Sequence, residues 1–180
     1  MTLDTIMVRD AREADIPAIR AIYAHHVQTG LASFEEVPPD EAEMLRRFRT
    51  LKEGGFPYLA AELAGDVVGY SYAGQYRPRP AYRYSVEDSV YVRDGMAGKG
   101  VGRALLTALL ARCTDMGFRQ MIAIIGDSAN HGSIGLHRAL GFEMVGTIRS
   151  VGFKHGRWVD SVLLQRALGE GDTSLPTLRP

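Results

Sequence analysis

The sequence has little cysteine, no excess charge of either sign and no long apolar run. Its 180 residues include one cysteine, Cys113, so an intrachain disulfide and a zinc site built from several cysteines are both excluded. Lys and Arg number 21, as do Asp and Glu, which disfavours a nucleic-acid-binding protein because that class carries a basic excess. No apolar run approaches the ~18 residues of a membrane span. Residues 1–12 lack the apolar segment of a signal peptide, so the expected compartment is the cytoplasm.

What remains is typical of one globular domain. Hydrophobic residues make up 46% of the chain and charged residues 23%, which argues against a disordered protein. We expect a single domain over 1–168, followed by a flexible C-terminal tail over 169–180 that is rich in polar and turn-forming residues.

Gly, Pro and the spacing of apolar residues divide the chain into expected elements. Asp15 is the expected N-cap of a helix over 16–28, which Gly30 ends. The segment 30–38 has no clear period and is expected to be a loop. The other expected helices cover 40–53, 101–117 and 131–140, and strands cover 6–11, 57–63, 67–74, 85–93, 121–126, 142–150 and 157–166. This order predicts a mixed α+β domain rather than the regular βαβ alternation of a Rossmann fold.

The strongest local motif is a glycine-rich turn between a strand and a helix. Gly98, Gly100 and Gly102 alternate directly before the apolar helix, where they let the backbone approach a ligand closely. The first helical turn adds free N–H groups, so the segment predicts a phosphate or pyrophosphate cradle. It matches neither the P-loop nor the dinucleotide fingerprint. A purely structural glycine loop is the alternative.

This stretch, GKGVGR, resembles the pyrophosphate loop of the GNAT superfamily of acetyl-CoA-dependent N-acetyltransferases. The segment NHGSIGLHRALGF resembles that superfamily's second CoA-contacting segment. More narrowly, the chain resembles the phosphinothricin and methionine sulfoximine or sulfone acetyltransferases, through AIYAHHV, SFEEVPP, YSVEDSVYV, GKGVGRALL, NHGSIGLHRALGF and VGFKHGRWVDSVLLQ in this order. The sequence differs from the superfamily's pattern at Ala97, where the superfamily usually has Arg or Gln.

The resemblance implies a mixed central sheet flanked by helices, with two parallel strands that splay to admit the CoA pantetheine. It implies acetyl transfer from acetyl-CoA to the α-amine of a small amino acid or mimic, by direct attack, without a metal. It also implies a homodimer in which the segment around Phe153 and Trp158 completes the neighbouring active site. The implied acetyl-CoA contacts are Val90, Tyr91, Val92, Gly98, Lys99, Gly100, Val101, Gly102, Arg103, Asn130 and Ser133.

Acetyl transfer to an amine needs a neutral amine, a polarised thioester carbonyl and a protonated leaving thiolate. Glu87 or Asp88 could accept the ammonium proton directly or through a water, although both could instead form a solvated strand end. His137 stands where many members of the superfamily have a Tyr that protonates the thiolate. It could do the same, take the amine proton, or serve a structural role in its helix.

The substrate of the implied reaction carries a carboxylate, which arginine binds with two parallel hydrogen bonds. Arg77 is the preferred clamp, and a plain solvated loop is the alternative. The expected substrate-binding residues are Phe34, Arg77, Pro78, Arg79, Glu87, Asp88 and Ser89. His25 and His26 have no ligand-spaced partners and are interpreted as structural.

Two other functions remain open at this point. One is a protein or peptide acetyltransferase of the same fold. The other is a non-catalytic acyl-CoA-binding sensor, which would bind acetyl-CoA but release no thiol with any amine.

Overall fold

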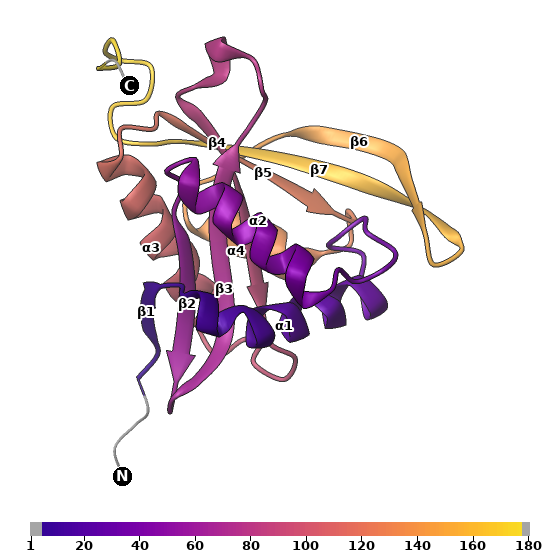
Figure 1. Cartoon of the computed structure of the whole chain (residues 1–180). Coiled ribbons are helices and arrows are strands. Elements are labelled where there is room, and N and C mark those ends of the chain that lie inside the picture. Colours follow the sequence, from indigo (N-terminus) through magenta and orange to yellow (C-terminus); the bar gives the residue numbers. More distant parts are fainter. Residues whose placement is uncertain (1–4, 178–180) are drawn as a thin grey trace.

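A single seven-stranded sheet carries helices on both of its faces in the computed structural model, which describes residues 5–177 (Figure 1). The strand order is β1-β2-β3-β4-β5-β7-β6, and every neighbouring pair is antiparallel except β4 and β5. The strands are β1 (Met7–Asp10), β2 (Tyr58–Leu63), β3 (Asp66–Gln75), β4 (Ser85–Val92), β5 (Gln120–Gly126), β6 (Glu143–Lys154) and β7 (Arg157–Ala167). The α-helices are α1 (Ile16–Thr29), α2 (Glu41–Glu53), α3 (Val101–Asp115) and α4 (His131–Ala139), and the short 3-10 helices are η1 (Glu13–Asp15) and η2 (Pro80–Tyr82). The expected mixed α+β fold is therefore confirmed.

Two hydrophobic cores lie on opposite faces of the sheet. Tyr70 of β3 packs in the core formed with α1 and α2, whereas Ala73 of the same strand belongs to the larger core formed with α3. Helix α3 approaches β3 closely because Gly69 lacks a side chain. A Cβ at this position would lie 2.9 Å from Cγ1 of Val101 and 3.0 Å from Cδ1 of Leu105.

The central strands β4 and β5 separate part of the way along their length. They pair only between 85–87 and 120–122, although β4 continues to Val92 and β5 to Gly126. Beyond this short ladder, a strand edge on each side faces a gap instead of a hydrogen-bonded neighbour. This gap is the structural origin of the site described below.

The expected elements agree with the observed ones, apart from small shifts at their ends, and Asp15 occupies the N-cap position of α1 as predicted, although its side chain does not cap the helix. Asp15 has helical backbone angles and makes no side-chain cap to α1. Its carboxylate instead accepts hydrogen bonds from the Arg9 guanidinium at 2.7 and 2.9 Å and from the Arg12 N–H at 2.8 Å. Because Arg9 and the Arg12 N–H occupy the Asp15 carboxylate, it is not available to cap the first turn of α1.

The described end of the chain, as far as Leu175, lies against the start of β5. Arg119 donates hydrogen bonds to the Gly171 carbonyl, the Ser174 hydroxyl and the Leu175 carbonyl. These contacts belong to the described part of the expected tail. Residues 1–4 of the expected domain and residues 178–180 of the expected tail lie outside the described residues. Among the described helices, none combines the length and apolar character needed to cross a membrane.

Candidate active site

A large cavity of about 860 Å³ opens beside the glycine-rich turn. Gly98 and Gly100 have φ of 75° and 87°, a left-handed conformation that favours glycine. The first hydrogen bond within α3 runs from the Ala104 N–H to the Gly100 carbonyl at 3.0 Å. The amides before Ala104 therefore have no acceptor inside the helix and lie at its positive end. This arrangement fits the phosphate groups of a CoA-type ligand.

Most of the expected acetyl-CoA contacts line this cavity. The lining residues include Val90, Tyr91, Val92, Gly98, Gly100, Gly102, Arg103, Asn130 and Ser133, together with Ala97. Lys99 and Val101 do not line it. The side chain of Val101 is buried in the α3 core, while the Lys99 ammonium lies 3.7 Å from the sulfur of Met96, so Val101 can contribute only its main chain.

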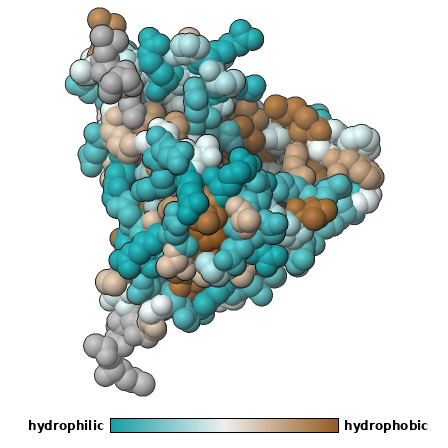
Figure 2. All heavy atoms as spheres, in the orientation of Figure 1, coloured by the Kyte–Doolittle hydropathy of each residue, from teal (hydrophilic) through white to brown (hydrophobic). Residues whose placement is uncertain are grey.

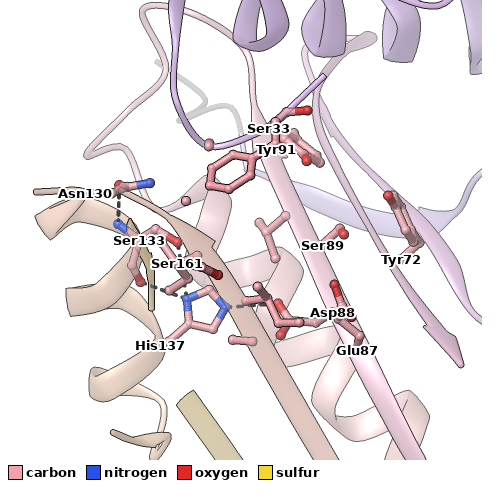
Figure 3. Close-up of a pocket in the computed structure, with 17 residues that line it drawn as sticks. Ser33, Tyr72, Glu87, Asp88, Ser89, Tyr91, Asn130, Ser133, His137 and Ser161 are labelled. Atoms are coloured by element: carbon pink, nitrogen blue, oxygen red, sulfur yellow. Dashed lines mark hydrogen bonds and ion pairs between the residues drawn. The ribbon is translucent and has the colours of Figure 1, made fainter. Parts of the chain in front are cut away.

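A second, smaller cavity of about 310 Å³ lies where β4 and β5 separate (Figure 3). It joins the larger one through residues that line both, namely Ala32, Val90, Tyr91, Gly126, Asn130 and Ser133. The expected residues Phe34, Glu87, Asp88, Ser89 and His137 all line it. Side chains far apart in the sequence thus meet around one small space.

The ladder between β3 and β4 determines which backbone groups of β4 face the gap. The Arg93 N–H donates to the Val68 carbonyl at 2.9 Å. Because hydrogen-bonded positions alternate in an antiparallel pair, Tyr91 bonds toward β3, while Val90 and Val92 turn their N–H and C=O groups toward the gap. His26 donates through Nε2 to the Val92 carbonyl at 2.8 Å. Val90 therefore offers its main-chain groups to a ligand, whereas Tyr91 reaches the cavities with its side chain.

Asp88 and His137 form a buried pair at the base of the gap, joined by a dashed line in Figure 3. Nδ1 of His137 donates to the Ser133 carbonyl at 2.8 Å, and Nε2 lies 2.9 Å from Oδ2 of Asp88. A hydrogen bond at the latter contact requires one proton, on Nε2 or on Oδ2. Burial alone lowers the pKa of His137, but the hydrogen bond and charge of Asp88 outweigh it, so the pKa is raised. Within the described residues, Oδ1 of Asp88 is buried without a hydrogen-bond partner.

Glu87 points to the other side of β4 from Asp88, as expected for neighbours in a strand. Burial raises the pKa of the Glu87 carboxyl, the negative charge of Asp88 raises it further, and Arg77 opposes both effects. A carboxyl group that lines a cavity and has a raised pKa is suited to accept a proton from an amine bound in that cavity.

Three expected substrate-binding residues, Arg77, Pro78 and Arg79, line neither cavity. The segment between β3 and β4 that contains Arg77, Pro78 and Arg79 rises beyond the end of the sheet, at the top of Figure 1, and all three residues are exposed. The Arg77 guanidinium stacks over the Tyr76 ring at 5.2 Å. Its charge nevertheless acts on Glu87, so within this chain Arg77 contributes to the electrostatics of the site without forming its wall.

Several lining residues were not predicted from the sequence. Ser33, Tyr72 and Ser161 all face the smaller cavity (Figure 3). Tyr72 lies opposite Ser89 in the ladder between β3 and β4, and Ser161 lies opposite Gly126 in the ladder between β5 and β7. Strand pairing, rather than any motif, would have indicated Tyr72 and Ser161, whereas Ser33 lies in the loop between α1 and α2. No cluster of three or more His, Cys, Asp and Glu side chains suited to a metal occurs in residues 5–177.

A split central sheet, a glycine-rich helix start beside the split and two carboxyl groups that line the adjoining cavity define an acyl-CoA-dependent acyltransferase fold. Residues 8–163 match the family model of the acetyltransferase (GNAT) domain. The chain therefore belongs to the GNAT family, and it is an acetyltransferase, as the resemblance of its motifs implied.

Its relatives narrow the class. The chain is 57% identical over 169 residues to a phosphinothricin N-acetyltransferase of Alcaligenes faecalis, a match that covers 94% of this chain and 86% of the relative. It is 46% identical over 159 residues to an L-methionine sulfoximine/L-methionine sulfone acetyltransferase of Pseudomonas aeruginosa, covering 88% and 92% of the two chains. The crystal structure of a GNAT superfamily phosphinothricin acetyltransferase from Sinorhizobium meliloti in complex with AcCoA superposes with a TM-score of 0.93 at 52% identity, covering 96% of this chain and 94% of that one.

Proposed function

We propose that this protein transfers the acetyl group of acetyl-CoA to the α-amine of a small amino acid or amino-acid mimic of the phosphinothricin, methionine sulfoximine or methionine sulfone type. The observation that carries the proposal is the junction of the two cavities at the split between β4 and β5. The larger cavity suits a CoA chain, and the smaller one, lined by Glu87 and Asp88, suits a small amine. The names of the relatives at 57% and 46% identity support the same substrate class.

The CoA end of acetyl-CoA would be held by backbone groups. The amides before Ala104 would bind the pyrophosphate at the positive end of α3. Val90 would present its N–H to the thioester carbonyl across the gap, which stabilises negative charge on that oxygen during attack. Ala97 lines the cavity but offers no charged side chain, so the backbone would supply most of the phosphate contacts.

Proton transfer would be divided between two carboxylates. The substrate's α-ammonium group loses two protons in all as its nitrogen forms a bond to the acetyl carbon and the carbon–sulfur bond breaks. Glu87 would accept the first, directly or through a water, and pass it to solvent. The second proton would pass to the Asp88–His137 pair, which gives a proton to the departing sulfur. Both ring nitrogens of His137 are engaged, so the proton that it shares with Asp88 would reach the gap through the Asp88 carboxylate. We therefore assign Asp88 and His137 to this step as a pair.

The enzyme would work as a homodimer in the cytoplasm. Apolar side chains gather along the ribbon of β6 and β7, which appears brown at the upper right of Figure 2. Those that are at least 50% exposed are Val145, Ile148, Val151, Phe153 and Trp158. The rings of Phe153 and Trp158 pack edge to face at 5.2 Å. Such a contiguous exposed apolar patch is typical of an interface.

Replacing Trp158 with Asp is therefore expected to convert a dimer into a monomer, because a buried charge is incompatible with an apolar interface. Light scattering at micromolar concentration measures the mass, and a rate measurement on the same sample shows whether the pocket needs the second copy. Replacement of the solvent-exposed Leu175, which lies outside the ribbon, with Asp is the control. A fully active wild-type monomer would contradict the proposed assembly.

Arg77→Ala is expected to lose about 10-fold in kcat/KM on free amino acids. Arg77 lines neither cavity, so this loss is the size expected for a charge that attracts the substrate carboxylate without a direct hydrogen bond, roughly 1 kcal/mol. The loss should be much smaller on the matching amino-acid amides, which have no carboxylate for the Arg77 charge to attract. Equal losses on acids and amides would assign Arg77 to the structure of its loop instead.

The proposal as a whole is tested by following thiol release from acetyl-CoA with a panel of amines. We expect release with methionine sulfone, methionine sulfoximine or phosphinothricin, and little with peptides. Release with peptides alone would indicate a protein acetyltransferase. Tight binding of acetyl-CoA without release for any amine would indicate a sensor.

A further inference from the structure

The loop between α1 and α2 forms one wall of the smaller cavity, through Ala32, Ser33 and Phe34. It is fastened to the distant strand β6 by a buried lysine. Nζ of Lys154, whose residue is only 2% exposed, donates to the Ser33 carbonyl at 2.6 Å. Burial lowers the pKa of Lys154, and the charges of Glu36 and Glu35 oppose this shift. A buried ammonium that donates to one main-chain carbonyl holds the loop at that residue.

The rest of the loop is held from the other side by α1 and α2. The Tyr23 hydroxyl donates to Oε1 of Glu35 at 2.9 Å and lies 2.8 Å from the Ser33 hydroxyl. Arg47 of α2 also binds Glu35, with its closest nitrogen at 2.6 Å. Because Ser33 and Glu35 flank Phe34 on both sides, the backbone at Phe34 has little freedom to withdraw.

The Phe34 ring lies against the backbone of two glycines, Gly126 and Gly152. A Cβ at Gly152 of β6 would lie 2.5, 2.8 and 2.9 Å from three carbons of that ring, and one at Gly126 would lie 3.0 Å from a fourth. Phe34 and Gly126 line the smaller cavity, and Gly152 does not. The ring therefore lies between Gly152 and the cavity, and we expect a group added at Gly152 to displace it toward the cavity.

We propose that Gly152 is a specificity-determining position: the absence of a side chain there sets how far Phe34 enters the substrate cavity, while the Lys154–Ser33 bond keeps the loop against the ribbon. The proposal rests on the proposed function, because it concerns the side chain of the amino acid that is acetylated. Its consequence is that the length of side chain accepted depends on a residue outside the cavity wall.

The test is Gly152→Ala, assayed with methionine sulfone and with S-methylcysteine sulfone, which is one methylene shorter. Overpacking against a held ring is expected to raise KM for the longer sulfone about 10-fold, with kcat and the KM for acetyl-CoA nearly unchanged and the shorter sulfone little affected. Gly146→Ala is the matched control, because it lies on the same strand and its Cβ would meet nothing within 4 Å.

Removing the ring separates the proposed mechanism from a general disturbance of β6. In a Phe34→Ala background, Gly152→Ala should no longer change the ratio of the two KM values. The proposal is overturned if Gly152→Ala leaves that ratio at the wild-type value, or if the ratio changes equally with and without the ring. Failure of the wild type to acetylate either sulfone would instead count against the proposed function, so the two failures are distinguishable.

Discussion

Glu87→Gln is expected to lower kcat by roughly 10²–10⁴-fold, the usual contribution of a general base. The amide is close in shape to the carboxylate but cannot accept the ammonium proton. Glu87 lines the smaller cavity, and burial, with Asp88 beside it, raises the pKa of its carboxyl. A steady-state rate at saturating acetyl-CoA measures the loss.

The pH dependence of this variant identifies Glu87 as the base. The active form of Glu87 is the carboxylate, so the wild-type rate should fall as the pH drops through the raised pKa. This acidic limb should be missing in Glu87→Gln. Glu41→Gln, an exposed position at the start of α2, is the control and should behave as wild type. A near-normal rate with the same acidic limb in Glu87→Gln would move the role of base to Asp88 and His137.

Gly100→Val is expected to raise the KM for acetyl-CoA on the order of 10²–10³-fold. The valine side chain would stand where the backbone must approach the pyrophosphate, and loss of two hydrogen bonds to a charged group, at about 1.5–3 kcal/mol each, accounts for such a change. Gly100 starts α3 with φ of 87° and open space around its Cβ position, so this side chain would project into the ligand's place. Calorimetric titration with acetyl-CoA measures the affinity directly.

The strain of a β-branched residue at positive φ needs its own control, because it destabilises the fold irrespective of the ligand. Gly117, just beyond the other end of α3, has φ of 82° and also has nothing within 4 Å of its Cβ position. Gly117→Val should therefore lose a similar amount of thermal stability and keep its affinity for acetyl-CoA. Equal affinities in Gly100→Val and the wild type would remove the glycine turn from the binding site.

The local parts of this fold could be predicted because Gly and Pro mark where elements end and apolar spacing marks their faces. The glycine turn before α3 was found in this way, and so was the loop that contains Phe34. Asp15 was correctly placed at the N-cap of α1, but its side chain does not cap the helix, because its carboxylate binds the Arg9 guanidinium instead. Competition between a local cap and a charged partner is decided by the tertiary structure.

The functional contacts of the site are mostly non-local, and no sequence motif encodes them. Asp88 and His137 are 49 residues apart, and Lys154 lies 121 residues from the Ser33 carbonyl that it binds. The residues were candidates, but their pairing depends on how β4 and α4 cross the split in the sheet. Arg77 illustrates the opposite case: its type suits a carboxylate, yet its loop stands outside the cavities of this chain.

Direct acetyl transfer to an α-amine is the central claim, and one measurement tests it most directly. The protein is incubated with acetyl-CoA, first alone and then with methionine sulfone, while mass spectrometry follows both the protein and the small molecules. We expect an unchanged protein mass with acetyl-CoA alone. After the amine is added, we expect N-acetylmethionine sulfone and free CoA in equal amounts. A protein that gains an acetyl group before the amine is added, or free CoA without an N-acetylated amino acid, would contradict the account.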